Sequence, residues 1–344
     1  MKKAAERYDG DGIEDAPGSP KIDVIQIGNE VDGGPFWDDT PPHYALLLKK
    51  SYQAIKQVAP DMKVAIAGVA TPEGFYRYYR PVFKELEKIK DKKPGERYFD
   101  VFDFHWSGQF RGDYKAIELP EKTYEMRDFI SDVKSDLKEM GYGDVLFYIT
   151  EMSDYSGRPN MNRAMKYPYH SEQYQAASLV KRYVYSLACG VDKIYWVTLQ
   201  EFNGFGGMFD GYFDNVGLVK NPSPGKPACK KLAYYTYKKM TEVLAGSDWR
   251  SIQKVRESGG IHIYRFSKNG KSIWVAWNDT KTKQQVNISG IAAKNVRITR
   301  SVPAAKAGRA VTDYTKAFEI KTLPAKDGME NLSPGSIPIF VEEE

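Results

Sequence analysis

The 344-residue chain has 50 basic and 45 acidic residues, which gives a net charge of +5, and 42% of its residues are apolar. The basic residues are scattered among acidic ones, and no run of about 18 apolar residues occurs, so the sequence predicts neither a nucleic-acid partner nor a membrane span. The two cysteines, Cys189 and Cys229, exclude a disulfide framework and lack a metal-binding spacing.

The amino-terminal segment, residues 1–21, is polar and contains the run Asp9-Gly10-Asp11-Gly12-Ile13-Glu14-Asp15. Carboxylates at Asp9, Asp11 and Asp15 around a glycine turn are typical of calcium loops, so a structural calcium ion is one interpretation. The EF-hand spacing is incomplete, and a solvated turn is the other interpretation. Residues 1–8 lack the apolar run of a signal peptide, so secretion or surface display would need a signal upstream, and the location stays open.

Strands and helices alternate from residue 22 to residue 244. The apolar runs predict strands at 22–28, 62–68, 98–106, 144–150 and 193–199. Helical periodicity predicts helices at 42–59, 72–89, 121–140, 171–189 and 227–244, with a surface loop at 91–95 and a glycine-rich loop at 203–217. Strict alternation favours parallel strands joined by right-handed crossovers. Five such units suit part of a (β/α)8 TIM barrel, which has eight.

The pattern changes after residue 246, where short strands and turns replace the helices. Asn269-Gly270 lies between apolar runs at 261–266 and 272–277, which is a strong hairpin signal. Further strands are expected near 286–290, 295–301, 317–321 and 337–341. We therefore predict an α/β barrel domain over 1–245 and a small antiparallel β-sandwich over 246–344.

Chemically useful side chains collect at the carboxyl ends of the predicted strands, where parallel α/β folds place their reacting groups. These residues are Asn29, Glu30, His105, Trp106, Glu151 and Trp196. A retaining glycosidase needs one carboxyl as acid and base and one carboxylate as nucleophile, about 5 to 5.5 Å apart. An amide can bind the sugar 2-hydroxyl, a histidine can orient the site, and tryptophan rings can stack on sugar. Taken singly, each residue also fits a structural role.

Ile27-Gly28-Asn29-Glu30 and Tyr148-Ile149-Thr150-Glu151 resemble the motifs of the clan A glycoside hydrolases. In that clan the acid/base glutamate follows an asparagine at the end of strand 4, and the nucleophile ends strand 7. The resemblance implies that Glu30 is the acid/base, Glu151 the nucleophile and Asn29 the 2-hydroxyl contact. It implies that His105, at the end of strand 6, is a subsite residue that binds substrate, and that Trp196 on strand 8 is the active-site tryptophan. No cofactor or catalytic metal is required, and the partner is a carbohydrate substrate.

The resemblance covers strands 4–8, so the first three βα units of the barrel are missing from it. We therefore expect a fragment or half of a split protein, with open strand edges that could bind a missing amino-terminal half or a second copy. The alternative to a hydrolase is a carbohydrate-binding or scaffold protein without turnover, because the incomplete barrel lacks part of its substrate floor.

Overall fold

The computed structural model describes residues 1–33, 36–89, 97–107, 111–159, 167–202, 211–223, 225–325 and 329–344. The predicted loop at 91–95 and most of the predicted glycine-rich loop at 203–217 lie outside these residues. The chain forms two compact units. Unit 1 comprises Met1–Trp106, Ala116–Met152 and Val191–Tyr195, and unit 2 comprises Ser107–Lys115, Ser153–Gly190 and Trp196–Glu344.

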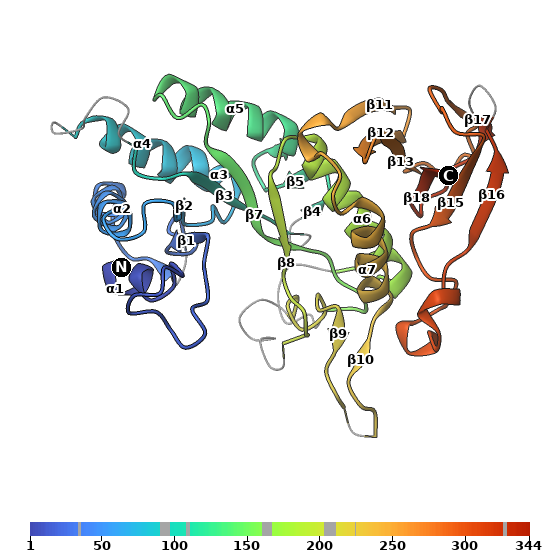
Figure 1. Cartoon of the computed structure of the whole chain (residues 1–344), viewed down its shortest axis with the longest axis horizontal. Coiled ribbons are helices and arrows are strands. Elements are labelled where there is room, and N and C mark those ends of the chain that lie inside the picture. Colours follow the sequence, from blue (N-terminus) through green and yellow to red (C-terminus); the bar gives the residue numbers. More distant parts are fainter. Residues whose placement is uncertain are drawn as a thin grey trace. The chain divides into compact units, whose positions relative to one another are not determined.

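A curled parallel sheet, half of a barrel, organises unit 1 (Figure 1). Its strands, in spatial order, are β1 (Val24–Ile27), β2 (Lys63–Ile66), β3 (Val101–Ser107), β7 (Leu146–Ser153) and β8 (Lys193–Trp196). Spatial order follows chain order, and β2 pairs in parallel with both β1 and β3. The predicted partial barrel with its five strands is therefore confirmed.

The helices of unit 1 are α1 (Lys2–Glu6), α2 (Pro41–Lys56), α3 (Pro72–Gly74), α4 (Arg80–Glu87) and α5 (Met126–Glu139). A π-helical turn, Phe75–Tyr79, joins α3 to α4 inside the helix predicted at 72–89. Pro81 has no N–H to donate to the preceding turn, which explains an irregular ladder there. Among the described helices of the chain, none is long and apolar enough to cross a bilayer.

Two buried tyrosine hydroxyls form hydrogen bonds with the backbone at the ends of the first two strands. The Tyr44 hydroxyl of α2 donates to Ile27 O at 2.8 Å and accepts from Ala67 N at 2.7 Å. The Tyr79 hydroxyl donates to Ala67 O at 2.7 Å. These bonds satisfy backbone groups where β1 and β2 end, so the turn that follows β1 starts from a fixed point.

The region before α5 differs from the prediction. The helix predicted at 121–140 begins only at Met126, because Thr123–Glu125 is a strand, β6, which pairs antiparallel with β5 (Ala116–Glu118). Thr123 and Tyr124 favour an extended backbone, and their cross-strand partners outweigh the helical pattern. Strand β7 also runs past its predicted end at residue 150, so Glu151 lies within the strand.

Unit 2 contains two long helices, α6 (Glu172–Ala188) and α7 (Leu232–Leu244), which pack together. Three two-residue strands also belong to unit 2: β4 (Arg111–Gly112), β9 (Val219–Lys220) and β10 (Cys229–Lys230). Single 3₁₀ turns span Trp249–Ser251, Gly308–Ala310 and Tyr314–Lys316. The helix predicted at 227–244 begins five residues late, because Cys229 and Lys230 pair with β9.

The carboxyl-terminal part of unit 2 is antiparallel. A six-stranded sheet has the order β11 (Gln253–Ser258), β12 (Ile261–Lys268), β13 (Lys271–Asn278), β18 (Ile339–Glu343), β15 (Asn295–Arg300) and β16 (Ile320–Pro324). A two-stranded sheet pairs β14 (Val286–Ile288) with β17 (Met329–Leu332). One apolar cluster, which includes Trp274 and Val341 of the large sheet and Val286 and Ile288 of the small one, fills the space between them.

The hairpin predicted at Asn269-Gly270 is confirmed. Asn269 (φ 52°) and Gly270 (φ 77°) adopt the left-handed conformations of a tight two-residue turn between β12 and β13. Strands β11 and β17 were not predicted, and the strand predicted at 317–321 lies at Ile320–Pro324 instead. The division of domains at residues 245 and 246 stays a prediction.

Candidate active site

Glu30 lies in the turn that follows β1. Gly28 has φ +89° and Glu30 has φ +43°, so the backbone turns through the left-handed region twice within three residues. Glycine adopts this conformation freely, whereas a glutamate there is strained by roughly 1–3 kcal/mol. Glu30 N donates to Gly68 O at 3.1 Å, which ties the strained turn to the end of β2. Such strain is typical of functional sites.

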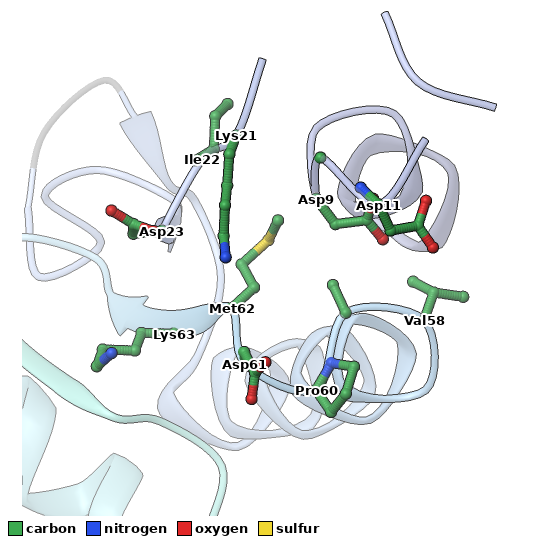
Figure 2. A pocket seen from close by; sticks show the side chains of 12 residues that line it. Asp9, Asp11, Lys21, Ile22, Asp23, Val58, Pro60, Asp61, Met62 and Lys63 are labelled. Carbon is green, nitrogen blue, oxygen red and sulfur yellow. The ribbon is translucent and has the colours of Figure 1, made fainter. Parts of the chain in front are cut away.

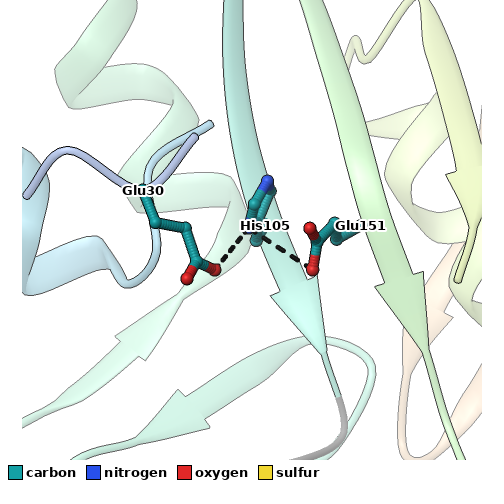
Figure 3. A group of neighbouring side chains, drawn as sticks. All are labelled: Glu30, His105 and Glu151. Carbon is teal, nitrogen blue, oxygen red and sulfur yellow. Dashed lines mark hydrogen bonds and ion pairs between the residues drawn. The ribbon is translucent and has the colours of Figure 1, made fainter. Parts of the chain in front are cut away.

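The predicted residues Glu30, His105 and Glu151 come together in unit 1 (Figure 3). The imidazole of His105, on β3, lies between the two carboxylates, one from the turn after β1 and the other from β7. His105 Nδ1 is 2.7 Å from Glu30 Oε1 and 3.7 Å from Glu151 Oε2. One ligating atom from each of the three side chains lies within 4.8 Å of the others. The fold therefore brings together three residues that the pattern of strand ends selected, although Glu30 and Glu151 are 121 positions apart in the chain.

A hydrogen-bond chain behind His105 limits where its protons can be. Thr150 Oγ1 donates to Asp103 Oδ2 at 2.6 Å, which uses its single proton. The contact of 3.3 Å between Thr150 Oγ1 and His105 Nε2 then requires the proton on the nitrogen. The short contact between His105 Nδ1 and Glu30 consequently contains one further proton, which either atom can hold.

Burial and charge shift the pKa values around this chain in specific directions. Burial alone would lower the pKa of His105, but the hydrogen bond to Glu30 and the neighbouring carboxylates outweigh it and raise that pKa. Burial raises the pKa of Glu151, helped by the charge of Glu30 and opposed by His105. The site therefore holds its protons more tightly than the same groups would in water.

Asp103 was not predicted as a site residue. It is fully buried and accepts from the backbone N–H of Thr150 at 3.0 Å as well as from its hydroxyl. Burial raises its pKa to about 6, against the opposing effect of His105 and Thr150. Phe102-Asp103-Phe104-His105 alternates apolar and polar residues, so the period of a strand places Asp103 and His105 on one face and would have identified it.

Replacing Asp103 with asparagine should change how stability depends on pH. Because the folded pKa of about 6 exceeds the reference value of 3.8, folding favours the protonated form, and this contribution to stability is lost as pH rises from about 4 to about 6. The variant lacks this loss, so its free energy of unfolding relative to the unmodified protein should rise over that interval and then level off. Urea unfolding of both proteins at pH 4, 5, 6 and 7 measures this difference in the free energy of unfolding. A difference that does not change with pH would contradict the raised pKa of Asp103.

Asp32 is a second unpredicted carboxyl near the site. It is 6% exposed, and its two oxygens accept from Ala70 N at 3.1 and 3.2 Å. Burial raises its pKa, opposed by the bond from Ala70 and supported by the charge of Glu30. Gly74 passes so close that a Cβ there would lie 1.7 Å from Asp32 Oδ2. No local sequence pattern distinguishes this aspartate from a surface residue, because the loop that buries it comes from residues 70–74.

The remaining predicted substrate-binding residues lie in different surroundings. Asn29 is half-buried beside Glu30. Trp106 is fully buried, on the opposite face of β3 from His105, and its ring packs against Phe104 and Phe129. Trp196 belongs to unit 2, where its Nε1 donates to Val216 O at 3.1 Å. The roles proposed for these three residues in substrate binding stay predictions.

Among the residues that the structure describes, two groups of side chains have the geometry of a cation site. Glu30, His105 and Glu151 form one, since carboxylates and imidazole are metal ligands, and the expectation of no catalytic metal stays a prediction. Asp9, Asp11 and Asp15 form the other, and all three carboxylates already accept backbone N–H groups of their own loop.

The loop that holds Asp9 and Asp11 borders a pocket of about 470 Å³ in unit 1 (Figure 2). Residues 58–63, from the end of α2 to the start of β2, and residues 21–23 complete its wall. Lys21 and Lys63 line it together with the acidic residues, so its charge is mixed. Neither interpretation of the loop, calcium site or solvated turn, is decided by this arrangement.

Comparison with known proteins identifies the fold. No family model and no curated protein matches the sequence. Among solved structures, the α-L-arabinofuranosidase of Thermotoga maritima has a TM-score of 0.65 at 12% identity, over 100% of this chain and 72% of that one. A glucosidase from Croceicoccus marinus gives 0.62 at 12% identity, over 99% and 72%. The catalytic domain of xylanase C from Talaromyces cellulolyticus gives 0.57 at 13% identity, over 100% and 67%.

These structures all have the fold of the clan A glycoside hydrolases. The present chain has that fold too, which confirms the resemblance predicted from Asn29-Glu30 and Glu151. Because the identities are 13% or lower, the likeness establishes the fold and leaves substrate and activity to be argued from the site.

Proposed function

We propose that the protein is a retaining glycoside hydrolase that cleaves O-glycosidic bonds of a polysaccharide or oligosaccharide. The observation that supports it most is the pair Glu30 and Glu151 on either side of His105, with one oxygen of each carboxylate within 4.8 Å of one oxygen of the other. Retaining enzymes need their carboxyl groups about 5 to 5.5 Å apart, whereas inverting enzymes leave roughly 6.5–9.5 Å for a water molecule. The close pair favours retention.

The reaction proceeds in two displacements. Glu30 donates a proton to the leaving oxygen while Glu151 attacks the anomeric carbon, which forms a covalent glycosyl ester and releases the aglycone. Glu30 then removes a proton from water, which attacks the same carbon and frees Glu151. Asn29 binds the 2-hydroxyl group, and Trp106 and Trp196 contribute to sugar binding.

His105 is a positioning residue in this scheme. Its Nδ1 shares one proton with Glu30, and Thr150 and Asp103 fix its other nitrogen. An acid/base group must be protonated in the first step and ionised in the second. A partner that can hold the same proton makes it easier for Glu30 to change between these two protonation states. The raised pKa of His105 fits this role because the imidazole then binds the proton readily.

The finer structural assignments belong to the same proposal. The five parallel strands correspond to strands 4–8 of the clan barrel, and the antiparallel sheets form a β-sandwich domain from residue 246 onward. The substrate is a carbohydrate, which the arabinofuranosidase and xylanase activities of the structural neighbours support, and no cofactor is needed. A calcium ion held by Asp9, Asp11 and Asp15 would stabilise the amino-terminal loop.

Replacing Glu30 with glutamine tests the acid/base assignment. General acid catalysis matters most when the leaving group is a poor one, so we expect a loss of about 10²–10⁴-fold in kcat/KM for an alkyl glycoside. A dinitrophenyl glycoside, whose leaving group needs no proton, should lose far less in its first step. Equal losses for both substrates would contradict the assignment.

The open sheet favours one other function. Within the described sheet, β1 pairs with β2 alone and β8 with β7 alone, so these two are its edge strands. A carbohydrate-binding or scaffold protein could use these edges to bind a partner or a second copy. It would bind sugar without releasing product, so an assay for new reducing ends separates it from the hydrolase.

A further inference from the structure

Unit 2 contains a pocket that the proposed reaction does not use. Its volume is about 470 Å³, and every residue of its wall belongs to unit 2. One side is α6, from Ser171 to Arg182, and the other side is formed by Asp279 and residues 336–337, with Asp113 and Tyr114 completing the wall. The volume is within the range of sites that hold small ligands.

An ordered aromatic ring borders this pocket. Tyr174 is 47% exposed, and its ring lies 3.8 Å from the imidazole of His170, centroid to centroid. His170 in turn stacks on Tyr155 at 4.3 Å, with an angle of 15° between the planes. The planes of Tyr174 and His170 are tilted by 36°, so Tyr174 packs on the end of the His170–Tyr155 stack, which restricts its orientation and leaves part of it accessible. A flat ring held in this way is a platform for an apolar ligand face.

The carboxylates of the pocket are all paired with cations. Asp279 accepts from Lys181 Nζ at 2.9 Å and from the Tyr114 hydroxyl at 2.6 Å. Asp154 is paired with Arg182 Nη2 at 3.4 Å. Asp113 has Lys115 Nζ at 3.5 Å. The charges of the wall are thus paired and close to electrically neutral, and apolar surface lies between them, which favours an uncharged ligand with both hydroxyl groups and an apolar face over an anion or a metal ion.

Arg182 retains an unused donor. The residue is 3% exposed, and its Nε and Nη2 atoms bond to Ser178 and Asp154. Nη1 is buried and has no hydrogen-bond partner among the described residues. Buried donors are nearly always satisfied, so this atom indicates an acceptor, such as an ordered water molecule behind the pocket wall, that the described residues do not supply.

We propose that this pocket is a second carbohydrate-binding site, which takes a neutral glycan. The less polar face of a sugar ring stacks on Tyr174, and its hydroxyl groups bond to the paired charges of α6 and Asp279. The choice of a glycan as ligand rests on the proposed function, whereas the site itself uses none of the residues assigned to the reaction. Such a site would hold a polysaccharide chain on unit 2 independently of cleavage.

Affinity electrophoresis tests the site with three soluble polysaccharides in the gel: wheat arabinoxylan and barley β-glucan, which are neutral, and polygalacturonate, which is anionic. The proteins all carry Glu151→Gln to prevent hydrolysis. We expect at least one neutral glycan to retard the parent and polygalacturonate not to do so. Retardation by neither neutral glycan, or an equal effect of polygalacturonate, overturns the proposal.

Substitutions at the platform localise the binding. Tyr174→Ala should weaken retardation by about three- to tenfold, because an aromatic contact contributes roughly 0.5–1.5 kcal/mol. Tyr174→Phe should retain it, since the ring remains. Tyr169 is 65% exposed and outside the pocket wall, so Tyr169→Ala is the matched control. Equal dissociation constants for Tyr174→Ala and Tyr169→Ala, in proteins with the parent's thermal midpoint, overturn the assignment.

The second binding site and the proposed hydrolysis can fail independently, and different measurements test them. Hydrolysis of aryl glycosides by the unmodified protein tests Glu30 and Glu151 alone. Glycan binding that depends on Tyr174 without any hydrolysis would overturn the proposed reaction and support the second site. Hydrolysis without Tyr174-dependent glycan binding would support the proposed reaction and overturn the second site.

Discussion

Changing Glu151 to glutamine should lower kcat/KM for an aryl glycoside by on the order of 10⁴-fold, with little change in stability. The amide has the shape of the carboxylate, but it cannot form the glycosyl ester that divides the reaction into two steps. The side chain is 30% exposed, and burial raises its pKa, so removing the charge should not unfold the protein. Initial rates and the thermal midpoint measure the two effects.

A control variant at another glutamate and the addition of an external nucleophile make this experiment more specific. Glu118 is exposed on β5, so Glu118→Gln should keep full activity. In Glu151→Ala, sodium azide can enter the space left by the carboxylate and attack the sugar from the same face. The glycosyl azide should then have the anomeric configuration opposite to that of the normal product. A Glu151→Gln protein with more than a tenth of normal activity would remove Glu151 from the mechanism.

The second large effect is expected from a methyl group at Gly68. A Cβ at this position would lie 2.1 Å from His105 Nε2 and 2.7 Å from its Cδ2, distances that no pair of atoms tolerates. Gly68→Ala therefore forces the imidazole away from the two carboxylates. A displacement of about 1 Å at a catalytic centre can cost roughly 10²-fold in rate, so kcat/KM should fall by about that factor.

The same substitution should also change the pH profile. Without the imidazole between them, the two carboxylates lose the positive charge that opposes the rise in the pKa of Glu151, so the acidic limb of the profile should move to higher pH. Gly143→Ala is the control, since its Cβ would meet nothing closer than Lys138 Cγ at 4.0 Å. Activity within twofold of normal in Gly68→Ala would show that His105 has no positioning role.

The sequence predicted the parallel sheet because its strands are apolar runs bounded by glycine, proline and polar residues, and tertiary packing does not alter such runs. It also predicted the meeting of Glu30, His105 and Glu151, because parallel strands place their carboxyl ends at one edge. The pattern failed at residues 123–125, where pairing with β5 overrides a weak helical preference. Here the determining contact comes from another part of the chain.

The groups around the pair were harder to predict. Asp32 becomes a buried carboxyl only because residues 70–74 fold over it, and Thr150 acts through a hydroxyl whose partners lie on another strand. Trp106 and its neighbour His105 lie on opposite faces of β3, because the alternation of a strand turns adjacent side chains away from each other, and the role of Trp106 in sugar binding stays a prediction. Strand periodicity separates such neighbours, and distance along the chain does not.

The tyrosine hydroxyls that fasten the ends of β1 and β2 have an evolutionary consequence. Tyr44 and Tyr79 hold Ile27 and Ala67 from helices, without help from the loops beyond the strands. The framework therefore sets the end of β1, where the turn to Glu30 begins. Loops farther along the chain can lengthen, shrink or change composition while this starting point keeps its place. Under the proposed function, descendants of such a protein could acquire new substrates by loop replacement, with the chemistry proposed for Glu30 unchanged.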